Sequence, residues 1–225
     1  MSLRNACTIN HRNNCYTVVN LGVYAKYLFP YLMDWVMGSR RLQEQRQEAF
    51  RPLHGDVLEI GFGTGLNLVH YPKAVTGVVA LEPARLLPRK VARRIAAAPM
   101  PVELVYGSAE RLSFGNRRFD CVLSTWTLCT IPDVLAALRE VRRVLKPGGR
   151  FVFLEHGRSN APAVARWQDR LNPLQQCIGV GCNMNRPIDR LIEEAGFMLE
   201  RLERFQMPGM PRLVGEMYRG VASAH

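Results

Sequence analysis

The feature that most constrains the fold is a glycine-rich turn that directly follows an apolar segment. Residues 57–60 read Val-Leu-Glu-Ile, and Gly61, Gly63 and Gly65 follow at alternate positions. Glycine permits positive φ and close approach of a ligand to the main chain, and the first amides of a helix opening after such a turn are unpaired donors. A strand, this turn and a following helix therefore predict a nucleoside-binding turn.

The glycine spacing separates two classes of nucleoside ligand. A dinucleotide fingerprint would place its third glycine where Leu66 stands. Glu59 lies two residues before Gly61, and a carboxylate there suits an amine-bearing or cationic ligand and repels phosphates. Both observations disfavour a pyrophosphate ligand, so an NAD-dependent oxidoreductase is the weaker interpretation.

The length and the net charge of the chain limit its possible domain organisation and its possible partners. The 225 residues favour one domain, at 51–225, preceded by an N-terminal extension at 1–50. The net charge of +11 favours anionic partners, but much of it falls on expected helix faces without interleaved aromatic residues. We therefore expect no nucleic-acid partner, whereas an anionic membrane surface stays open as one. The sequence does not indicate an oligomeric state.

The cysteines and the N-terminal segment indicate the compartment. None of the six cysteines forms a closely spaced zinc or redox pair, and Cys177 and Cys182 lack further ligands nearby in sequence, so no metal is expected. A reduced, cytoplasmic location fits, with peripheral membrane association as an addition. Residues 1–20 do not read as a secretory signal. No transmembrane helix is expected, because the apolar stretch 18–37 is interrupted by Asn20, Lys26, Pro30 and Asp34.

An amphipathic helix is predicted from Pro30 onward, after a segment at 1–16 that we expect to be poorly ordered. Three interpretations of this helix stay open: packing on the core, a lid over the active site, and insertion into a membrane interface. Tyr24, just before it, is a candidate for contact with a substrate. The apolar stripe of the helix consists of Leu28, Tyr31, Leu32, Trp35 and Val36.

Beyond residue 51, short apolar runs alternate with helical patterns. This alternation predicts a doubly wound α/β domain with a mostly parallel sheet and helices on both faces. Helices are expected at 132–145, before Lys-Pro-Gly-Gly, and at 186–194, before Gly196. Strands are expected at 57–60, 78–81, 102–105, 121–124 and 151–154, and apolar segments at 197–202 and 214–221 should complete the sheet.

Two further signals support a nucleoside ligand. Glu82 ends the second strand, seventeen residues beyond Gly65, where a carboxylate can accept hydrogen bonds from both ribose hydroxyls. Ser108, Ala109 and Glu110 follow the third strand and can place backbone amides against an adenine edge. A helix N-cap by Ser108 explains that segment equally well.

These segments resemble, in order, the motifs of class I S-adenosylmethionine-dependent methyltransferases over residues 50–220. The broad resemblance rests on 59–65, Glu82, 107–110, Phe-Asp-Cys-Val at 119–122 and Leu-Lys-Pro-Gly-Gly-Arg at 145–150. It implies a seven-stranded Rossmann-like methyltransferase fold with an N-terminal helical extension. Residues 128–131, Glu155-His156 and Gly181-Cys182-Asn183 with Arg186 are more narrowly similar to the thiol S-methyltransferase group and its bacterial relatives. Quinone-biosynthesis and phospholipid N-methyltransferases share the broader pattern.

The resemblance implies a role for each cofactor residue. Gly61, Gly63 and Gly65 would wrap the methionine part of S-adenosylmethionine, and Glu59 would lie near its ammonium group. Ser108 stands where relatives often carry an acid for the adenine amino group, so this chain departs from the family at that position. The remaining cofactor residues would be Glu82 with Pro83 at the ribose, Ala109 with Glu110 at the adenine, and Thr125 near the sulfonium.

The methyl acceptor and its chemistry are less constrained. Methyl transfer is an in-line displacement that needs a base only if the acceptor must lose a proton. His156, directly after the fifth strand, is the candidate base, and its alternative is a hydrogen bond to a neighbouring loop. Trp126 and Cys129 are expected near the acceptor, although core packing explains both.

We therefore expect an S-adenosylmethionine-dependent methyltransferase whose acceptor is small or hydrophobic, with a thiol sulfur favoured by the narrower resemblance. A phospholipid or another lipid-like amine is the alternative, which the basic charge and the aromatic helix favour. An alternative of another class is a noncatalytic S-adenosylmethionine-binding or partner protein.

Overall fold

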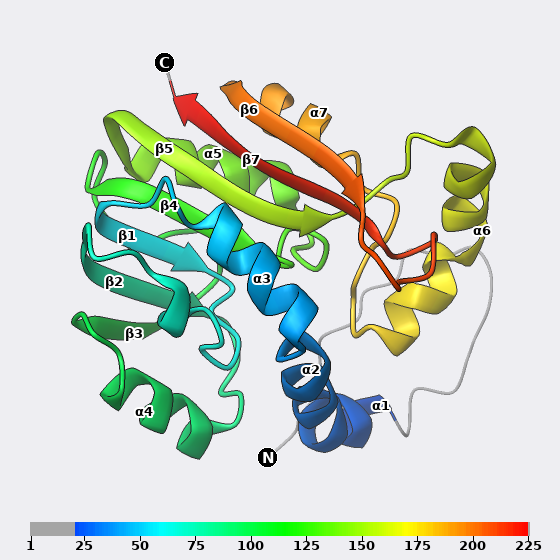
Figure 1. The fold of residues 1–225 in the computed structure, drawn as a ribbon, viewed down its shortest axis with the longest axis horizontal. Coiled ribbons are helices and arrows are strands. Elements are labelled where there is room, and N and C mark those ends of the chain that lie inside the picture. Colours follow the sequence, from blue (N-terminus) through cyan, green and yellow to red (C-terminus); the bar gives the residue numbers. More distant parts are fainter. Residues whose placement is uncertain (1–20, 225) are drawn as a thin grey trace, which may run out of the picture.

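A seven-stranded sheet forms the centre of the molecule, as the computed structural model of residues 21–224 shows (Figure 1). The strand order is β3-β2-β1-β4-β5-β7-β6, which confirms the Rossmann-like methyltransferase fold expected from the sequence. The strands are β1 (Gly55–Ile60), β2 (Val75–Glu82), β3 (Val102–Tyr106), β4 (Phe119–Thr125), β5 (Leu145–His156), β6 (Phe197–Gln206) and β7 (Glu216–Ala224).

The first five strands are parallel, and β7 inserts antiparallel between β5 and β6. β1 lies between β2 and β4, with Ile60 opposite Leu81 on one side and Ser124 on the other. The carboxyl ends of β1, β4 and β5 therefore meet at one edge of the sheet. In open parallel sheets, ligands bind at this edge, where the strand order reverses.

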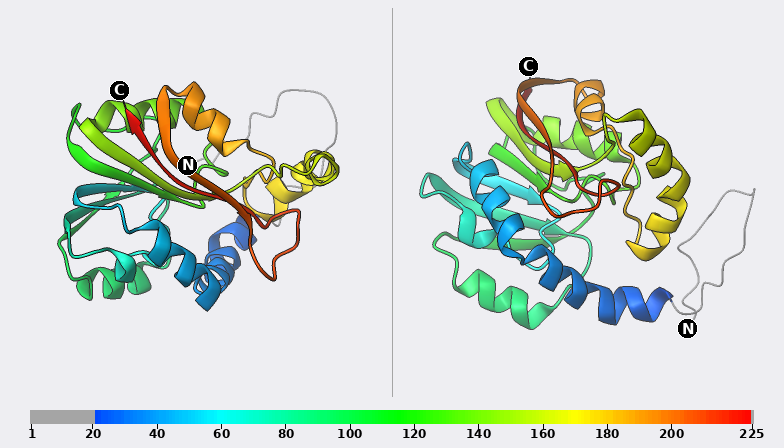
Figure 2. Two further views of the ribbon diagram at one scale, coloured as in Figure 1. Left: turned by 45° about the horizontal axis from the view of Figure 1, so that its top comes forward. Right: turned by 45° about the vertical axis from the view of Figure 1, so that its right-hand side comes forward.

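Helices cover both faces of the sheet (Figures 1 and 2). One face packs against α5 and α7, and the other against α3 and α4, through two separate clusters of buried apolar side chains. Burying both faces explains why β1 and β4 read as nearly continuous apolar runs. These four helices are α3 (Arg40–Ala49), α4 (Pro88–Ala96), α5 (Val134–Val144) and α7 (Ile188–Glu194), and a further helix, α6 (Pro162–Ile178), lies to the side of the sheet (Figure 1).

Local signals set the ends of the helices that the sequence predicted. Asp133 caps α5 by accepting a hydrogen bond from the Ala136 amide at 2.9 Å. The helix ends at Val144, shortly before Pro147, whose ring disfavours helical conformation in the preceding residue. Gly196 has φ of +86° just after α7. The observed bounds lie within two residues of the predicted ones.

The expectation of a helix directly after the glycine turn is wrong. Only a single 3-10 turn, Leu68–His70, follows Gly65, because Pro72 and the start of β2 at Val75 leave too few residues for an α-helix. No helix lies between β3 and β4 in the described chain either, so Ser108 is not a helix N-cap. Helices α3 and α6 were not predicted from the sequence.

The N-terminal helical segment begins earlier than predicted. It consists of α1 (Leu21–Val23), a π-helical turn (Tyr24–Leu28) and α2 (Phe29–Met37), with Pro30 in the first turn of α2. Residues 1–16, for which we expected poor order, lie outside the described part of the chain. None of the helices in residues 21–224 is both long and apolar enough to cross a membrane.

Candidate active site

The glycine turn is shaped by the two strands that flank it. The amides of Gly61 and Phe62 donate to the carbonyl of Leu81 at the end of β2. Gly61, Gly63 and Gly65 have φ of +72°, +60° and +80°, which other residues adopt only with strain. A Cβ atom on Gly61 would also collide with the side chain of Thr127, so this position requires glycine for space as well.

Glu82 lies against this turn. Its carboxylate accepts a hydrogen bond from the Gly63 amide at 2.7 Å and another from the Ala84 amide at 3.2 Å. Burial raises the pKa of Glu82, and these two donors partly offset that effect. Pro83, between them, is exposed. The structure thus brings the acid of β2 and the glycine turn of β1 together.

Glu59 forms the centre of a buried polar network under the turn. Its carboxylate accepts hydrogen bonds from Asn67 Nδ2 at 2.7 Å and from the Tyr71 hydroxyl at 2.6 Å. Asn67 Nδ2 also donates to Thr125 Oγ1 at 2.9 Å, and Asn67 Oδ1 accepts from Arg46 Nε at 2.7 Å. Burial raises the pKa of Glu59 to about 7. The network joins α3, β1, the segment after the turn and β4.

Sequence reasoning missed three members of this network: Arg46, Asn67 and Tyr71. Asn67 and Tyr71 closely follow the glycine turn, in a segment too short for a long helix. That short spacing is the sequence signal that their side chains return toward Glu59. Arg46 lies on α3 and had no local signal, because a single arginine on an amphipathic helix is usually solvated.

A second polar cluster attaches the N-terminal helix α2 to the turn. Asp34 accepts hydrogen bonds from Thr64 Oγ1 at 2.6 Å, Lys90 Nζ at 2.7 Å and Arg94 Nη1 at 2.6 Å. Burial alone would raise the pKa of Asp34, but Arg94 and Lys90 hold it well below its usual range. Lys90 and Arg94 contribute to the positive charge that we expected on helix faces, and both pair with this buried acid.

The segment after β3 forms a compact turn beside Glu82. The Gly107 amide donates to the Glu82 carbonyl at 3.3 Å, and Ser108 Oγ accepts from the Glu110 amide at 3.2 Å. Ala109 is buried, and Glu110 Oε1 accepts a hydrogen bond from the Asp133 amide at 2.7 Å. Ser108 therefore stabilises a turn instead of capping a helix.

A buried acid organises the loop after β4. Glu155 accepts hydrogen bonds from Ser124 Oγ at 2.7 Å and from the amides of Thr127 at 2.9 Å and Leu128 at 3.2 Å. Burial raises the pKa of Glu155 to about 7. Trp126, at φ of +48°, faces the guanidinium of Arg46 at 4.7 Å and is partly buried. Its ring therefore packs against the Glu59 network.

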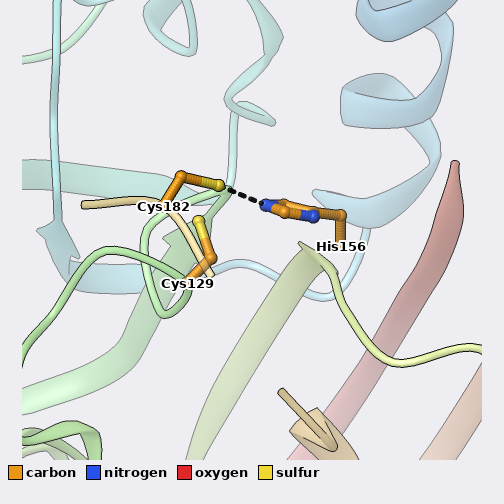
Figure 3. Close-up of side chains that lie close together, drawn as sticks. All are labelled: Cys129, His156 and Cys182. Carbon is orange, nitrogen blue, oxygen red and sulfur yellow. Dashed lines mark hydrogen bonds between the residues drawn. The ribbon is translucent and has the colours of Figure 1, made fainter. Parts of the chain in front are cut away.

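Cys129, His156 and Cys182 meet at this edge of the sheet, although they lie in three separate segments (Figure 3). Cys182 Sγ lies 3.2 Å from His156 Nε2, and one ligand atom from each of the three residues lies within 4.8 Å of the others. Hydrogen bonds from Cys129 and His156 lower the pKa of Cys182 below that of an ordinary thiol. The fold therefore brings two possible metal ligands, Cys129 and His156, next to Cys182. Cys177, in contrast, is exposed.

The remaining acceptor candidate, Tyr24, lies beside α6. Its hydroxyl donates to the Ile178 carbonyl at 3.2 Å, at the end of the helix that leads into the loop of Cys182. The cofactor candidates therefore gather around the turn, while Cys129 and His156 gather around Cys182.

Comparison with known proteins assigns the family. A model of the methyltransferase domain matches residues 58–153. The chain is 30% identical over 193 residues to thiol S-methyltransferase TMT1B of Rattus norvegicus, covering 79% of this chain and 78% of that protein. The chain belongs to the class I S-adenosylmethionine-dependent methyltransferases. The enzyme therefore uses S-adenosylmethionine as its methyl donor.

Other relatives are consistent with this family. The methyltransferase is 31% identical over 173 residues to demethylmenaquinone methyltransferase of Staphylococcus aureus, covering 66% of this chain and 70% of that protein. A solved structure from Thermotoga maritima, described as a S-adenosylmethionine-dependent methyltransferase and possible histamine N-methyltransferase, aligns with a TM-score of 0.62 at 21% identity. That alignment covers 90% of this chain and 96% of the other. At this identity the structural likeness shows the fold alone.

Proposed function

We propose that the enzyme transfers a methyl group from S-adenosylmethionine to the sulfur of a small or hydrophobic thiol. The observation that carries this proposal is the position of His156 beside two thiols at the carboxyl edge of the sheet. The relatives named thiol S-methyltransferases support the same acceptor.

The cofactor would lie across the glycine turn. Gly61 and Gly63 are partly exposed and leave the backbone open to the methionine part. Glu82 would accept the ribose hydroxyls, and the buried Ala109 would contact the adenine. Glu59 and Thr125 would act from beneath the turn through Asn67, Glu59 supplying negative charge for the ammonium group. This set fits a cationic nucleoside without a phosphate.

The acceptor thiol must lose a proton for its sulfur to attack efficiently, because the thiolate is the nucleophile. A new sulfur–carbon bond forms as the methyl–sulfonium bond breaks, and the electron pair stays on S-adenosylhomocysteine. We assign removal of the proton to His156, whose Nε2 faces Cys182. The chain otherwise supplies alignment and exclusion of water, which are worth about 7–11 kcal/mol in favourable intramolecular models.

Replacing His156 by Ala is expected to lower turnover with thiols about a hundredfold, which is the lower range for loss of a general base. The measurement is S-adenosylhomocysteine production across a panel of thiols, quinol precursors, amines and phospholipid vesicles. Affinity for S-adenosylmethionine should stay within about threefold, because His156 lies outside the cofactor set. His54→Ala is the matched control, since His54 is exposed and lies just before β1, at the opposite edge of the sheet from His156. Cofactor binding without turnover of any thiol would contradict the proposal.

A lipid-like amine is the alternative acceptor, and one surface favours it. The helical segment 21–37 leaves a row of large apolar side chains exposed, with Trp35 at 77%. A cavity of about 460 Å³ between α2 and α4 is lined by Tyr31, Leu87 and Pro88 together with the basic Arg89, Lys90 and Arg93. Aromatic and basic groups side by side suit an interface with anionic lipid.

If this surface contacts lipid, the enzyme should sediment with anionic vesicles at low salt and be released at high salt, because salt screens surface charge. Trp35→Gln should weaken this binding about tenfold, because the exposed indole would otherwise insert into the lipid interface. Leu202→Gln, on the edge strand β6, is the control. Vesicle binding together with turnover of phospholipid and of no thiol would move the acceptor to a lipid amine.

A further inference from the structure

Cys129, His156 and Cys182 form a cluster of possible metal ligands. If His156 acted only as a base, it would not need two thiols beside it. Two thiol sulfurs and one imidazole nitrogen converge from three segments: the loop after β4, the last residue of β5 and the loop after α6 (Figure 3). Cys129 and His156 are buried, at 2% and 8% exposure, and Cys182 is half-buried. The half-buried member leaves the group accessible from one side.

The three ligand atoms match the preferences of zinc. Zinc binds thiolate sulfur at about 2.3 Å and imidazole nitrogen at about 2.0–2.1 Å in tetrahedral geometry. Such distances place neighbouring ligand atoms about 3.5–3.8 Å apart. His156 Nε2 and Cys182 Sγ are 3.2 Å apart, and no pair exceeds 4.8 Å, so shifts of about 1 Å would complete the coordination.

The loops that carry the ligands are attached to one another. The backbone amide and the Nδ2 atom of Asn183 both donate to the Cys129 carbonyl at 2.9 Å. Arg186 donates to the Leu128 carbonyl, and Glu155 accepts from the Leu128 amide. These contacts hold Cys129 and Cys182 near each other without a disulfide between them, so the site is organised before a ligand binds.

We propose that Cys129, His156 and Cys182 bind one Zn²⁺ ion and leave a fourth coordination position for the acceptor thiol. The binding of the ion stands on geometry alone, while the fourth position rests on the thiol acceptor proposed above. Three protein ligands and one open position are the arrangement of catalytic zinc sites. In the metal-bound enzyme His156 is a ligand and activates the acceptor thiol through the ion, whereas in the metal-free enzyme it is the base assigned above.

The reaction then balances without an added oxidant or reductant. The thiol binds zinc as a thiolate and releases its proton to solvent. Its sulfur attacks the methyl carbon as the bond from that carbon to the sulfonium breaks, and S-adenosylhomocysteine leaves with the electron pair. The neutral thioether that forms is a weaker ligand and leaves the ion. Zinc does not change its oxidation state in this sequence.

The first test measures binding of Co²⁺, which reports tetrahedral thiolate sites by its visible and near-ultraviolet absorption. The full-length enzyme is freed of metal with a chelator, kept reduced with a phosphine and titrated with Co²⁺. We expect one equivalent to bind, with thiolate charge-transfer bands, and Zn²⁺ to displace it. Cys182→Ser should weaken the binding of Co²⁺ at least tenfold and reduce the intensity of these bands, because it removes one ligand.

Cys177→Ser is the matched control, because Cys177 is exposed and only five residues from Cys182. Circular dichroism of each variant checks that the fold is retained, and Cys129→Ser and His156→Ala provide independent losses of a ligand. Absence of stoichiometric binding to the reduced enzyme would overturn the site. So would equal weakening in the Cys177→Ser variant.

The second test separates the metal site from the acceptor. A thiol that the enzyme methylates should add a charge-transfer band to the Co²⁺ form in the absence of S-adenosylmethionine. If Co²⁺ binds and no thiol changes its spectrum, the open position is refuted. If metal-free enzyme methylates thiols at the full rate, the thiol acceptor stands and the role of zinc is overturned. If metal binds and no thiol is methylated, the site stands and the proposed acceptor fails.

Discussion

Replacing Glu82 by Ala is expected to raise the Kd for S-adenosylmethionine about a thousandfold. A charged acceptor contributes about 1.5–3 kcal/mol for each hydrogen bond, and the ribose would offer two hydroxyls. The carboxylate also accepts from the Gly63 amide, so its loss leaves a donor of the glycine turn unpaired. Isothermal titration with S-adenosylmethionine and S-adenosylhomocysteine measures the change.

Two further variants separate ribose binding from support of the turn. Glu82→Gln keeps a carbonyl that can accept from Gly63, and it should weaken binding less than Ala. Glu103→Ala is the control, because Glu103 is exposed on the neighbouring strand β3. Equal affinity of the wild-type and Ala enzymes would remove Glu82 from the cofactor site.

Arg46→Met is expected to lower the free energy of unfolding by about 3–5 kcal/mol at pH 8, the range for removing one partner of a buried charge pair. Arg46 is 3% exposed, donates to Asn67 and to the Met37 carbonyl at 2.7 Å each, and interacts electrostatically with Glu59. Met preserves much of the packing but removes the positive charge. Denaturant unfolding measures the loss, and Arg41→Met, exposed on the same helix, is the control.

The loss of unfolding free energy in Arg46→Met should depend on pH, because Glu59 titrates. Its folded pKa of about 7 lies above its ordinary value of 4.5, so its ionisation lowers stability as the pH rises from 4.5 through 7. Without Arg46 the folded pKa rises further, and the loss of stability continues to higher pH. The variant should therefore be much closer to wild type at pH 5 than at pH 8.

A double variant tests this explanation. Arg46→Met combined with Glu59→Gln removes both charges, and it should recover most of the stability at pH 8. The Gln carbonyl can accept from Asn67, while its amide can donate to the Tyr71 hydroxyl. A deficit that is independent of pH and additive with Glu59→Gln would show that Arg46 acts through packing alone.

The core of the sheet and the cofactor class could be predicted because their signals are local. Gly61, Gly63 and Gly65 specify a backbone conformation by themselves, and Glu82 ends an apolar run at a fixed distance along the chain. The positions of strands β1, β2, β4 and β5 follow from apolar runs that are buried on both faces. These strands extend beyond the apolar runs, and β5 begins at Leu145 instead of Phe151. The strand–turn–helix pattern predicts a helix after Gly65, but the short spacing to Pro72 leaves room only for the 3-10 turn Leu68–His70.

The sequence by itself therefore determined a doubly wound sheet with a glycine-rich turn and the class of the cofactor, since neighbouring residues encode them. Only the tertiary structure decided which charges are buried together and which nucleophiles meet. Arg46 reaches Asn67 across 21 residues, and Cys182 reaches His156 across 26. The local sequence of each residue does not specify its partner, because these contacts arise from chain packing that joins distant segments at one edge of the sheet.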